Sequence, residues 1–100
     1  MSLHLNQTVS RAGNLAQRLF EERMLVITAH NSTLHRFNEV GTFLWQQLDT
    51  PKTVDRLIQS VAENFQGFDA KRDSRDIMRF LEELGKKKLI EIKDNKANIE

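Results

Sequence analysis

The residues that most often perform chemistry are few in this sequence and stand apart from one another. The histidines are His4, His30 and His35, and no two of them have the i, i+3 or i, i+4 spacing of a metal site on a helix. There is no cysteine, which excludes disulfides, thiolate catalysis and thiolate metal sites. The pairs Glu21-Glu22 and Glu82-Glu83 are adjacent residues that we expect to be solvated, whereas an acid/base dyad needs a cleft. Since no glycine-rich phosphate loop is present either, the sequence predicts no catalytic, metal or cofactor site.

A group of basic side chains stands out between residues 71 and 88. This stretch holds seven basic and four acidic residues, although the net charge of the whole chain is only +1. On a helical wheel Arg72, Arg75, Arg79 and Lys86 gather opposite the apolar residues. Three explanations remain open: a solvated helix surface, attraction of an acidic peptide, or insertion of the helix into DNA. The small net charge argues against DNA, because phosphate-driven affinity depends on basic charge.

The length and composition fit one ordinary soluble domain. The longest apolar run, Met24 to Ile27, is far shorter than the roughly 20 residues of a membrane span. Residues 1–10 show no signal peptide, so we expect a cytoplasmic protein. Residues 1–13 are polar and aperiodic and predict a flexible arm, and residues 94–100 predict a flexible tail. The folded domain is therefore expected over residues 14–93.

Residues 15–37 predict a small antiparallel meander of three strands. Met24–Thr28 is apolar and partly β-branched, which is typical of a central strand. Leu15–Phe20 is a weaker strand, and the segment Ala29–Ser32 supplies turn formers. Thr33–Phe37 alternates in side-chain direction and comes last in the meander, so we expect its outer edge to be open.

Beyond the meander the apolar residues recur at helical spacing. Asn38 is a good N-cap for a first helix, and Thr53 caps a second helix with a clear apolar stripe. Asp69 or Asp73 starts a third helix, and Leu89–Ile92 reads as a short final strand. The pattern predicts a winged-helix-like α+β domain, with the meander followed by three helices and a short C-terminal strand.

The segment Phe37–Asp49 resembles the signature of the PqqD family. It contains the pattern Asn-x-x-Gly-x-x-x-Trp at Asn38, Gly41 and Trp45, and Thr53-Val54 follows at the family's spacing. The similarity extends over roughly residues 16–92. Taken on its own chemistry, Trp45 is expected to be a core aromatic residue.

The resemblance implies a function that the residues alone do not give. Domains of this family bind the leader of a ribosomally made precursor peptide, which adds as a strand beside the third strand in a groove edged by the third helix. They present it to a radical S-adenosylmethionine enzyme or another modifying enzyme. Backbone hydrogen bonds supply generic affinity in such strand addition, and side-chain pockets supply specificity. The implied peptide-binding residues are Thr33, Leu34, His35, Arg36, Phe37, Arg75, Met78 and Arg79.

The implied partners are thus a precursor peptide and its modifying enzyme. No cofactor and no membrane are expected, and nucleic acid is not an expected partner. An open edge strand could also pair with a second copy of the chain and form a homodimer. The alternative function is a winged-helix transcriptional regulator that binds DNA through its basic third helix.

Overall fold

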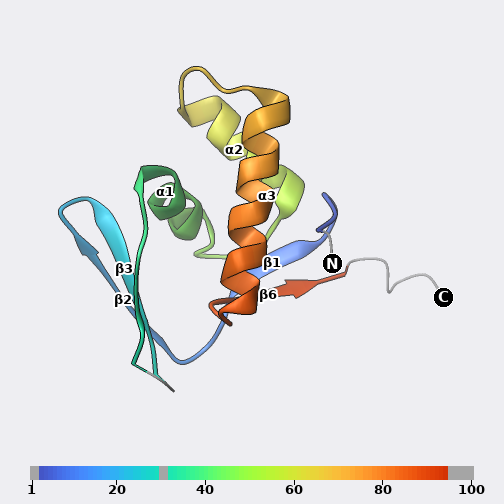
Figure 1. Ribbon diagram of the computed structural model, residues 1–100. Helices are drawn as coiled ribbons and strands as arrows, with labels where there is room; N and C mark the ends of the chain where they lie inside the picture. The colour runs from blue at the N-terminus through green and yellow to red at the C-terminus, as the bar shows by residue number, and fades with distance from the viewer. Residues whose placement is uncertain (1–2, 30–31, 95–100) are drawn as a thin grey trace.

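The computed structural model describes residues 3–29 and 32–94, and in them it shows two antiparallel sheets and three helices (Figure 1). The elements are β1 (Thr8–Arg11), β2 (Leu15–Phe20), β3 (Arg23–Thr28), β4 (Leu34–Arg36), α1 (Glu39–Gln47), β5 (Lys52–Thr53), α2 (Val54–Asn64), α3 (Ala70–Lys86) and β6 (Ile90–Lys93). The predicted α+β class, with antiparallel strands, three helices and a C-terminal strand, is confirmed.

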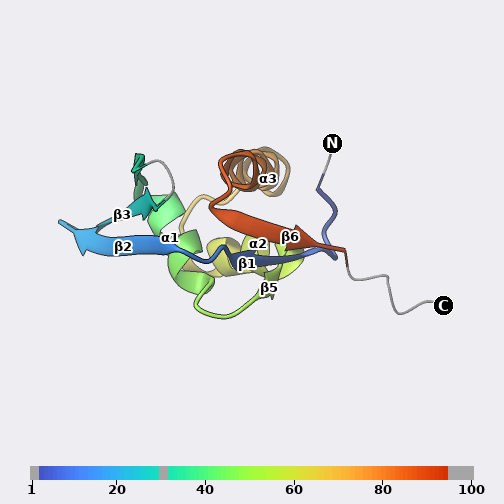
Figure 2. The same ribbon diagram turned by 90° about the horizontal axis from the view of Figure 1, so that it is seen from below.

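The first sheet is the predicted meander, in the order β2-β3-β4. Val26 of the central strand pairs with Gln17 on one side and with His35 on the other. Met24, Val26 and Thr28 are buried on the side of the helices, because side chains alternate along a strand. In Figures 1 and 2, α1 packs on this side of the sheet. Of the predicted turn Ala29–Ser32, residues 30 and 31 lie outside the described residues.

The second sheet has the order β5-β1-β6 and corrects the expectation of a flexible arm. Residues 8–11 pair with β6 from Thr8↔Lys93 to Arg11↔Ile90, and Val9 is completely buried. The sequence signal was weak because Val9 is the one fully buried apolar residue of β1 and its pairing partner lies at the other end of the chain. The structured domain therefore begins before residue 14. The predicted tail lies outside the described residues except for residue 94.

All three predicted helix starts carry a side-chain cap. Asn38 Oδ1 accepts the Gly41 backbone N–H at 2.8 Å, and Thr53 Oγ1 accepts that of Arg56 at 3.1 Å. Asp69 Oδ1 accepts two backbone N–H groups of the first turn of α3, from Lys71 at 3.1 Å and from Arg72 at 2.9 Å. Each cap satisfies amides that a helix leaves unpaired at its first turn. Asp69, rather than Asp73, therefore starts α3.

Trp45 lies at the centre of the core and has no exposed surface, which confirms its predicted role. Its indole Nε1 donates to Gln17 Oε1 of β2 at 2.6 Å. The Arg11 guanidinium of β1 lies 5.1 Å from the centre of the indole ring, and its Nη2 donates to the Trp45 carbonyl at 2.6 Å. Trp45 thus links α1 to both sheets. Within the described part of the chain, no helix has the length and apolar character to cross a membrane.

Candidate functional site

The strand β4 has one open edge, and the register shows which backbone groups it offers. Phe37 N–H donates to the Met24 carbonyl at 3.0 Å, and Thr28 N–H donates to the Thr33 carbonyl at 3.1 Å. Hydrogen-bonded pairs alternate along an antiparallel ladder, so His35, midway between these bonds, also directs its backbone groups toward β3. The backbone N–H and C=O groups of Leu34 and Arg36 therefore point to the open edge. No other described strand pairs there.

The side chains of β4 divide between the two sides of its sheet. His35 and Phe37 share the side of buried Val26, and Leu34 lies on the other side beside Ile27. Burial lowers the pKa of His35, and the nearby positive charge of Lys87 at the end of α3 lowers it further. His35 therefore faces α3 as a neutral imidazole near neutral pH.

Aromatic rings connect β4 to the first and third helices. The centre of the Phe37 ring lies 5.6 Å from that of Phe80 in an edge-on contact, and also 5.6 Å from that of Trp45. Phe37 is nearly fully buried, with 5 % of its surface exposed. It therefore anchors the end of β4 and fixes the distance between this strand and α3.

Gly41 explains the Asn-x-x-Gly spacing of the sequence. A Cβ atom at Gly41 would lie 3.0 Å from Phe80 Cζ, 3.2 Å from Asn38 Oδ1 and 3.3 Å from Phe37 Cβ. Contacts of this length are tighter than most real ones, so the neighbours of a side chain here would have to shift by a few tenths of an ångström. Glycine thus allows the first turn of α1 to approach both α3 and the end of β4, while Asn38 caps the same turn.

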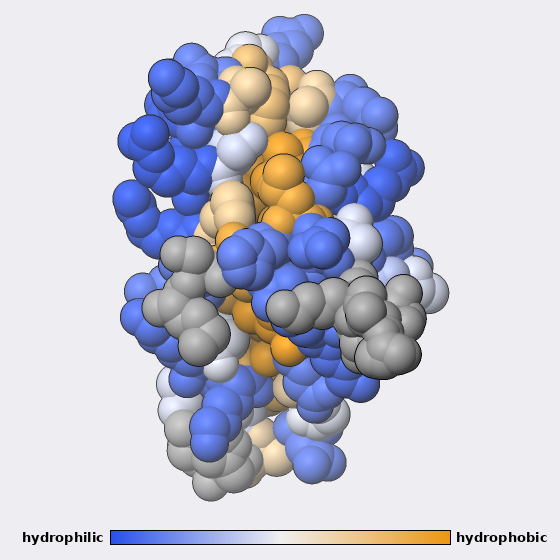
Figure 3. Space-filling view, turned by 90° about the vertical axis from the view of Figure 1, so that its right-hand side faces the viewer, coloured by the Kyte–Doolittle hydropathy of each residue, from blue (hydrophilic) through white to orange (hydrophobic). Residues whose placement is uncertain are grey.

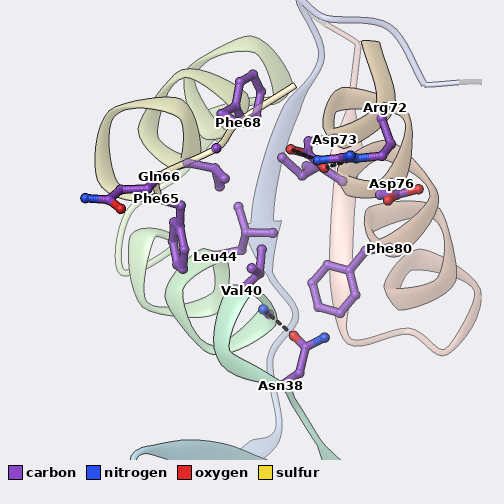
Figure 4. A pocket seen from close by; sticks show the side chains of 14 residues that line it. Asn38, Val40, Leu44, Phe65, Gln66, Phe68, Arg72, Asp73, Asp76 and Phe80 are labelled. Atoms are coloured by element: carbon purple, nitrogen blue, oxygen red, sulfur yellow. Dashed lines mark hydrogen bonds and ion pairs between the residues drawn. The ribbon is translucent and has the colours of Figure 1, made fainter. Parts of the chain in front are cut away.

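A cavity of about 360 Å³ opens where α1, α3 and the α2–α3 connection meet (Figure 4). Apolar side chains cover most of its wall, and polar side chains stand along its rim. The apolar lining comprises Val40, Leu44, Val61, Phe65, Phe68, Ile77 and Phe80, and the polar side chains are Asn38, Gln66, Arg72, Asp73 and Asp76. Phe80 and Asn38 stand at one end of the cavity in Figure 4. Asn38 follows β4 in the chain, so this end of the cavity lies next to the end of β4.

The rim of the cavity carries an ion pair between two neighbouring residues of α3. Arg72 Nε lies 3.1 Å from Asp73 Oδ1. The hydrogen bond from Arg72 lowers the pKa of Asp73, and the Asp69 backbone N–H lowers it further. The Asp73 carboxylate is therefore ionised near neutral pH, with its charge paired to that of Arg72.

The structure brings together only part of the predicted site. Residues 33–37 form one continuous stretch along the edge, although the strand proper is Leu34–Arg36. Met78 and Arg75 line a separate hollow with Leu3. They lie roughly 160° and 140° around the helix from Phe80, since each residue turns a helix by about 100°.

Figure 3 views the molecule from its terminal side, where hydrophobic side chains form a band between hydrophilic flanks.

The side of α3 that faces β4 has a different set of residues from the predicted one. It carries Asp76, Phe80, Glu83 and Lys87, which fall within roughly 60° of one another on the helix. Arg79 lines the same hollow as Arg75 and Met78, and its Nη1 lies 4.0 Å from Asp76 Oδ1. Neither Phe80 nor Lys87 was among the predicted peptide-binding residues. The spacing of Gly41 from Asn38 was the one signal that α3 comes close here.

The chemistry of this site is hydrogen bonding and packing. The site consists of strand amides at an open edge, an apolar cavity and a few charged side chains. Across the described ranges, no three His, Asp or Glu residues gather in a way that could hold a metal ion.

Comparison with known proteins gives two matches. Residues 20–90 match the family model described as "Coenzyme PQQ synthesis protein D (PqqD)". The solved structure "TbiB1 in Complex with the TbiA(beta) Leader Peptide" superposes with a TM-score of 0.75 at 18% sequence identity, covering 82% of this chain and 94% of that chain. No curated protein matches. The structural likeness shows a shared fold, and the family model spans most of the sequence. This chain belongs to the PqqD family.

Proposed function

We propose that this domain binds the leader segment of a ribosomally made precursor peptide and presents it to a peptide-modifying enzyme. The observation that carries the proposal is the open edge of β4, where the backbone groups of Leu34 and Arg36 face outward beside an apolar cavity. TbiB1, which has the same fold, was solved with a leader peptide. Family membership supports a presenting role without catalysis of its own, with a radical S-adenosylmethionine enzyme as the expected partner.

The edge alone supports only weak binding. Leu34 and Arg36 offer two N–H and two C=O groups, and one hydrogen bond contributes about 0.5–1.5 kcal/mol net. Four such bonds contribute roughly 2–6 kcal/mol, whereas even a millimolar complex needs about 4 kcal/mol. Side-chain contacts must therefore supply most of the affinity and all of the specificity.

The cavity is the natural source of the missing affinity. Complete burial of one Leu, Ile or Phe side chain contributes about 1.5–3 kcal/mol. A cavity of about 360 Å³ lined by Val40, Phe65 and Phe80 has room for such a side chain. We therefore expect the bound peptide to carry an apolar residue just beyond the segment that pairs with β4.

The basic stretch of residues 71–88 suggested attraction of an acidic peptide, but the charges next to the β4 edge are of both signs. The positive charge next to β4 comes from Lys87 near His35, whereas Asp76 stands at the cavity. Charge also disfavours DNA binding by α3, because two of the four residues on its basic side, Arg72 and Arg79, form ion pairs with Asp73 and Asp76. Lys87 itself lies 4.0 Å from Glu83, so an acidic peptide residue is favoured only weakly near His35.

The alternation of backbone groups along β4 provides the test. Proline at position 34 or 36 removes an N–H that faces the open edge, while proline at 35 removes one that bonds β3. Leu34→Pro and Arg36→Pro should weaken binding of a fluorescent leader peptide, taken from the precursor gene nearest to this one, at least tenfold. His35→Pro should instead lower the melting temperature of the domain.

The matched controls are Leu34→Ala and Arg36→Ala, which keep the amides and shorten side chains on the opposite side of the sheet. Circular dichroism establishes that each variant is folded before titration by fluorescence anisotropy. Equal peptide affinity for Leu34→Pro and Leu34→Ala would exclude strand addition at β4.

A further inference from the structure

The sheet β2-β3-β4 has a second face, which no described helix covers. Figures 1 and 2 show α1 on one side of this sheet and none of the helices on the other. The register orders the side chains of this outer face in three rows: Ala16, Ile27 and Leu34; then Arg18, Leu25 and Arg36; then Phe20 and Arg23. We call these eight residues the outer face.

The outer face combines exposed apolar side chains with positive charge. The exposed fractions of Phe20, Ile27 and Leu34 are 48%, 40% and 56%. Its three arginines, Arg18, Arg23 and Arg36, are exposed and take part in none of the ion pairs of the described residues. None of the eight residues is acidic, and Glu21 and Glu22 lie in the turn at the tip of the hairpin. An apolar patch with an arginine border is typical of a protein interaction surface.

We infer that the outer face docks an acidic protein surface with apolar residues at its centre, and that this surface belongs to the enzyme that modifies the bound peptide. Naming the enzyme rests on the proposed function, whereas the chemistry of the partner rests on the charge of the face. A second copy of the chain fits poorly, because it would bring arginines against arginines. Nucleic acid fits poorly as well, since aliphatic Leu25, Ile27 and Leu34 fill the centre where stacking rings would be needed.

Peptide binding and docking are coupled through β4. The same strand offers its backbone at the open edge and its Leu34 and Arg36 side chains to the outer face. A peptide that adds to this edge becomes the fourth strand of the sheet, and every second side chain of the peptide lies beside Leu34 and Arg36. The docking surface then includes part of the peptide. The enzyme should therefore bind the loaded domain more tightly than the empty one, and by linkage it should tighten peptide binding by the same factor.

The test measures binding of the full chain to the purified peptide-modifying enzyme encoded nearest to its gene, with and without the precursor peptide. The doubly reversed variant Arg18→Glu/Arg23→Glu removes the charge, and Ile27→Lys removes the apolar centre while adding positive charge. Both should weaken enzyme binding at least tenfold while leaving the affinity for the isolated leader peptide unchanged. The control Arg56→Glu/Lys71→Glu reverses two exposed charges on α2 and α3 and should change neither affinity.

Four results would overturn the inference. They are undetectable enzyme binding by the unmodified chain, equal losses in the outer-face and control variants, a dimer of the chain that Ile27→Lys dissociates, and duplex DNA binding that the arginine reversal abolishes. Loss of enzyme binding in the outer-face variants of a chain that binds no leader peptide would support the docking surface and refute the proposed function. The two proposals can therefore fail separately.

Discussion

Replacing Gly41 with alanine tests whether the close approach of α1 to α3 and β4 shapes the site. The new methyl group would lie 3.0 Å from Phe80 Cζ, and it would also press on Asn38 Oδ1 and Phe37 Cβ at 3.2 and 3.3 Å. Asn38 is held by its capping bond, and the Cβ of Phe37 moves only with its backbone. The Phe80 ring must therefore move away, and it lines the cavity.

Two opposing contributions set the magnitude. Alanine is favoured over glycine inside a helix by about 1 kcal/mol at most. Overpacking of a well-filled site costs about 1–3 kcal/mol. The net expectation is a loss of about 1 kcal/mol in the free energy of unfolding, which corresponds to a fall of roughly 4–8 °C in the melting temperature of a domain of this size. Displacement of Phe80 should also weaken leader-peptide binding.

Gly85→Ala is the matched control, because it makes the same chemical change in α3. A Cβ atom there meets only the flexible end of Ile92, with Cδ1 at 3.2 Å. The helix preference should then prevail, and the variant should be unchanged or more stable by up to about 1 kcal/mol. Thermal denaturation of both variants decides the matter. If Gly41→Ala is stabilised as much as Gly85→Ala, the close approach at Gly41 does not constrain the site.

Two further predictions concern single side chains. Thr53→Ala should lower the free energy of unfolding by about 1 kcal/mol, because it removes the cap on the Arg56 amide, and an unchanged midpoint in urea would show that the cap contributes nothing. The pKa of His35 in the folded protein lies below the ordinary 6.5, so as pH falls the unfolded chain binds a proton at this residue before the folded chain does. The stability contributed by neutral His35 is therefore complete above about pH 6.5, and it is lost as pH falls through the lowered pKa. His35→Gln should flatten this dependence between pH 8 and 5.5, and an identical pH dependence in both proteins would contradict the assignment.

The sequence predicted those elements that carry local signals. Asn38, Thr53 and Asp69 mark helix starts because their side chains bond to amides only two or three residues away. The meander could be predicted because strands that are neighbours in this sheet also follow one another along the chain. β1 and β5 were missed because they are short and depend on pairing with distant segments, which no local pattern encodes.

The candidate site likewise has one part that local sequence signals predicted and one part that they did not. The strand at the edge was predictable from its place in the meander, and β4 (Leu34–Arg36) is the edge strand of that sheet. The residues that α3 contributes to the site could not be predicted. A helical wheel identifies the side of the helix that faces the core, but it does not show which residues at the border of that side face β4. Contacts with Phe37 and Gly41 orient α3, and they bring Phe80 and Lys87 to the site while Arg75 and Met78 lie beside Leu3.

The Arg11–Trp45–Gln17 connection has a consequence for how the molecule opens. Arg11 belongs to the sheet built from the two ends of the domain, and Gln17 belongs to the sheet that offers the β4 edge. Both side chains form a hydrogen bond of 2.6 Å with Trp45: Arg11 donates to its backbone carbonyl, and Gln17 accepts from its indole Nε1. Strand fraying in one sheet must disturb the packing of the other, so the amides of β1 and β3 should exchange with solvent in a single cooperative unit. The β4 edge is then already rigid before a peptide binds, and little ordering entropy is lost on binding.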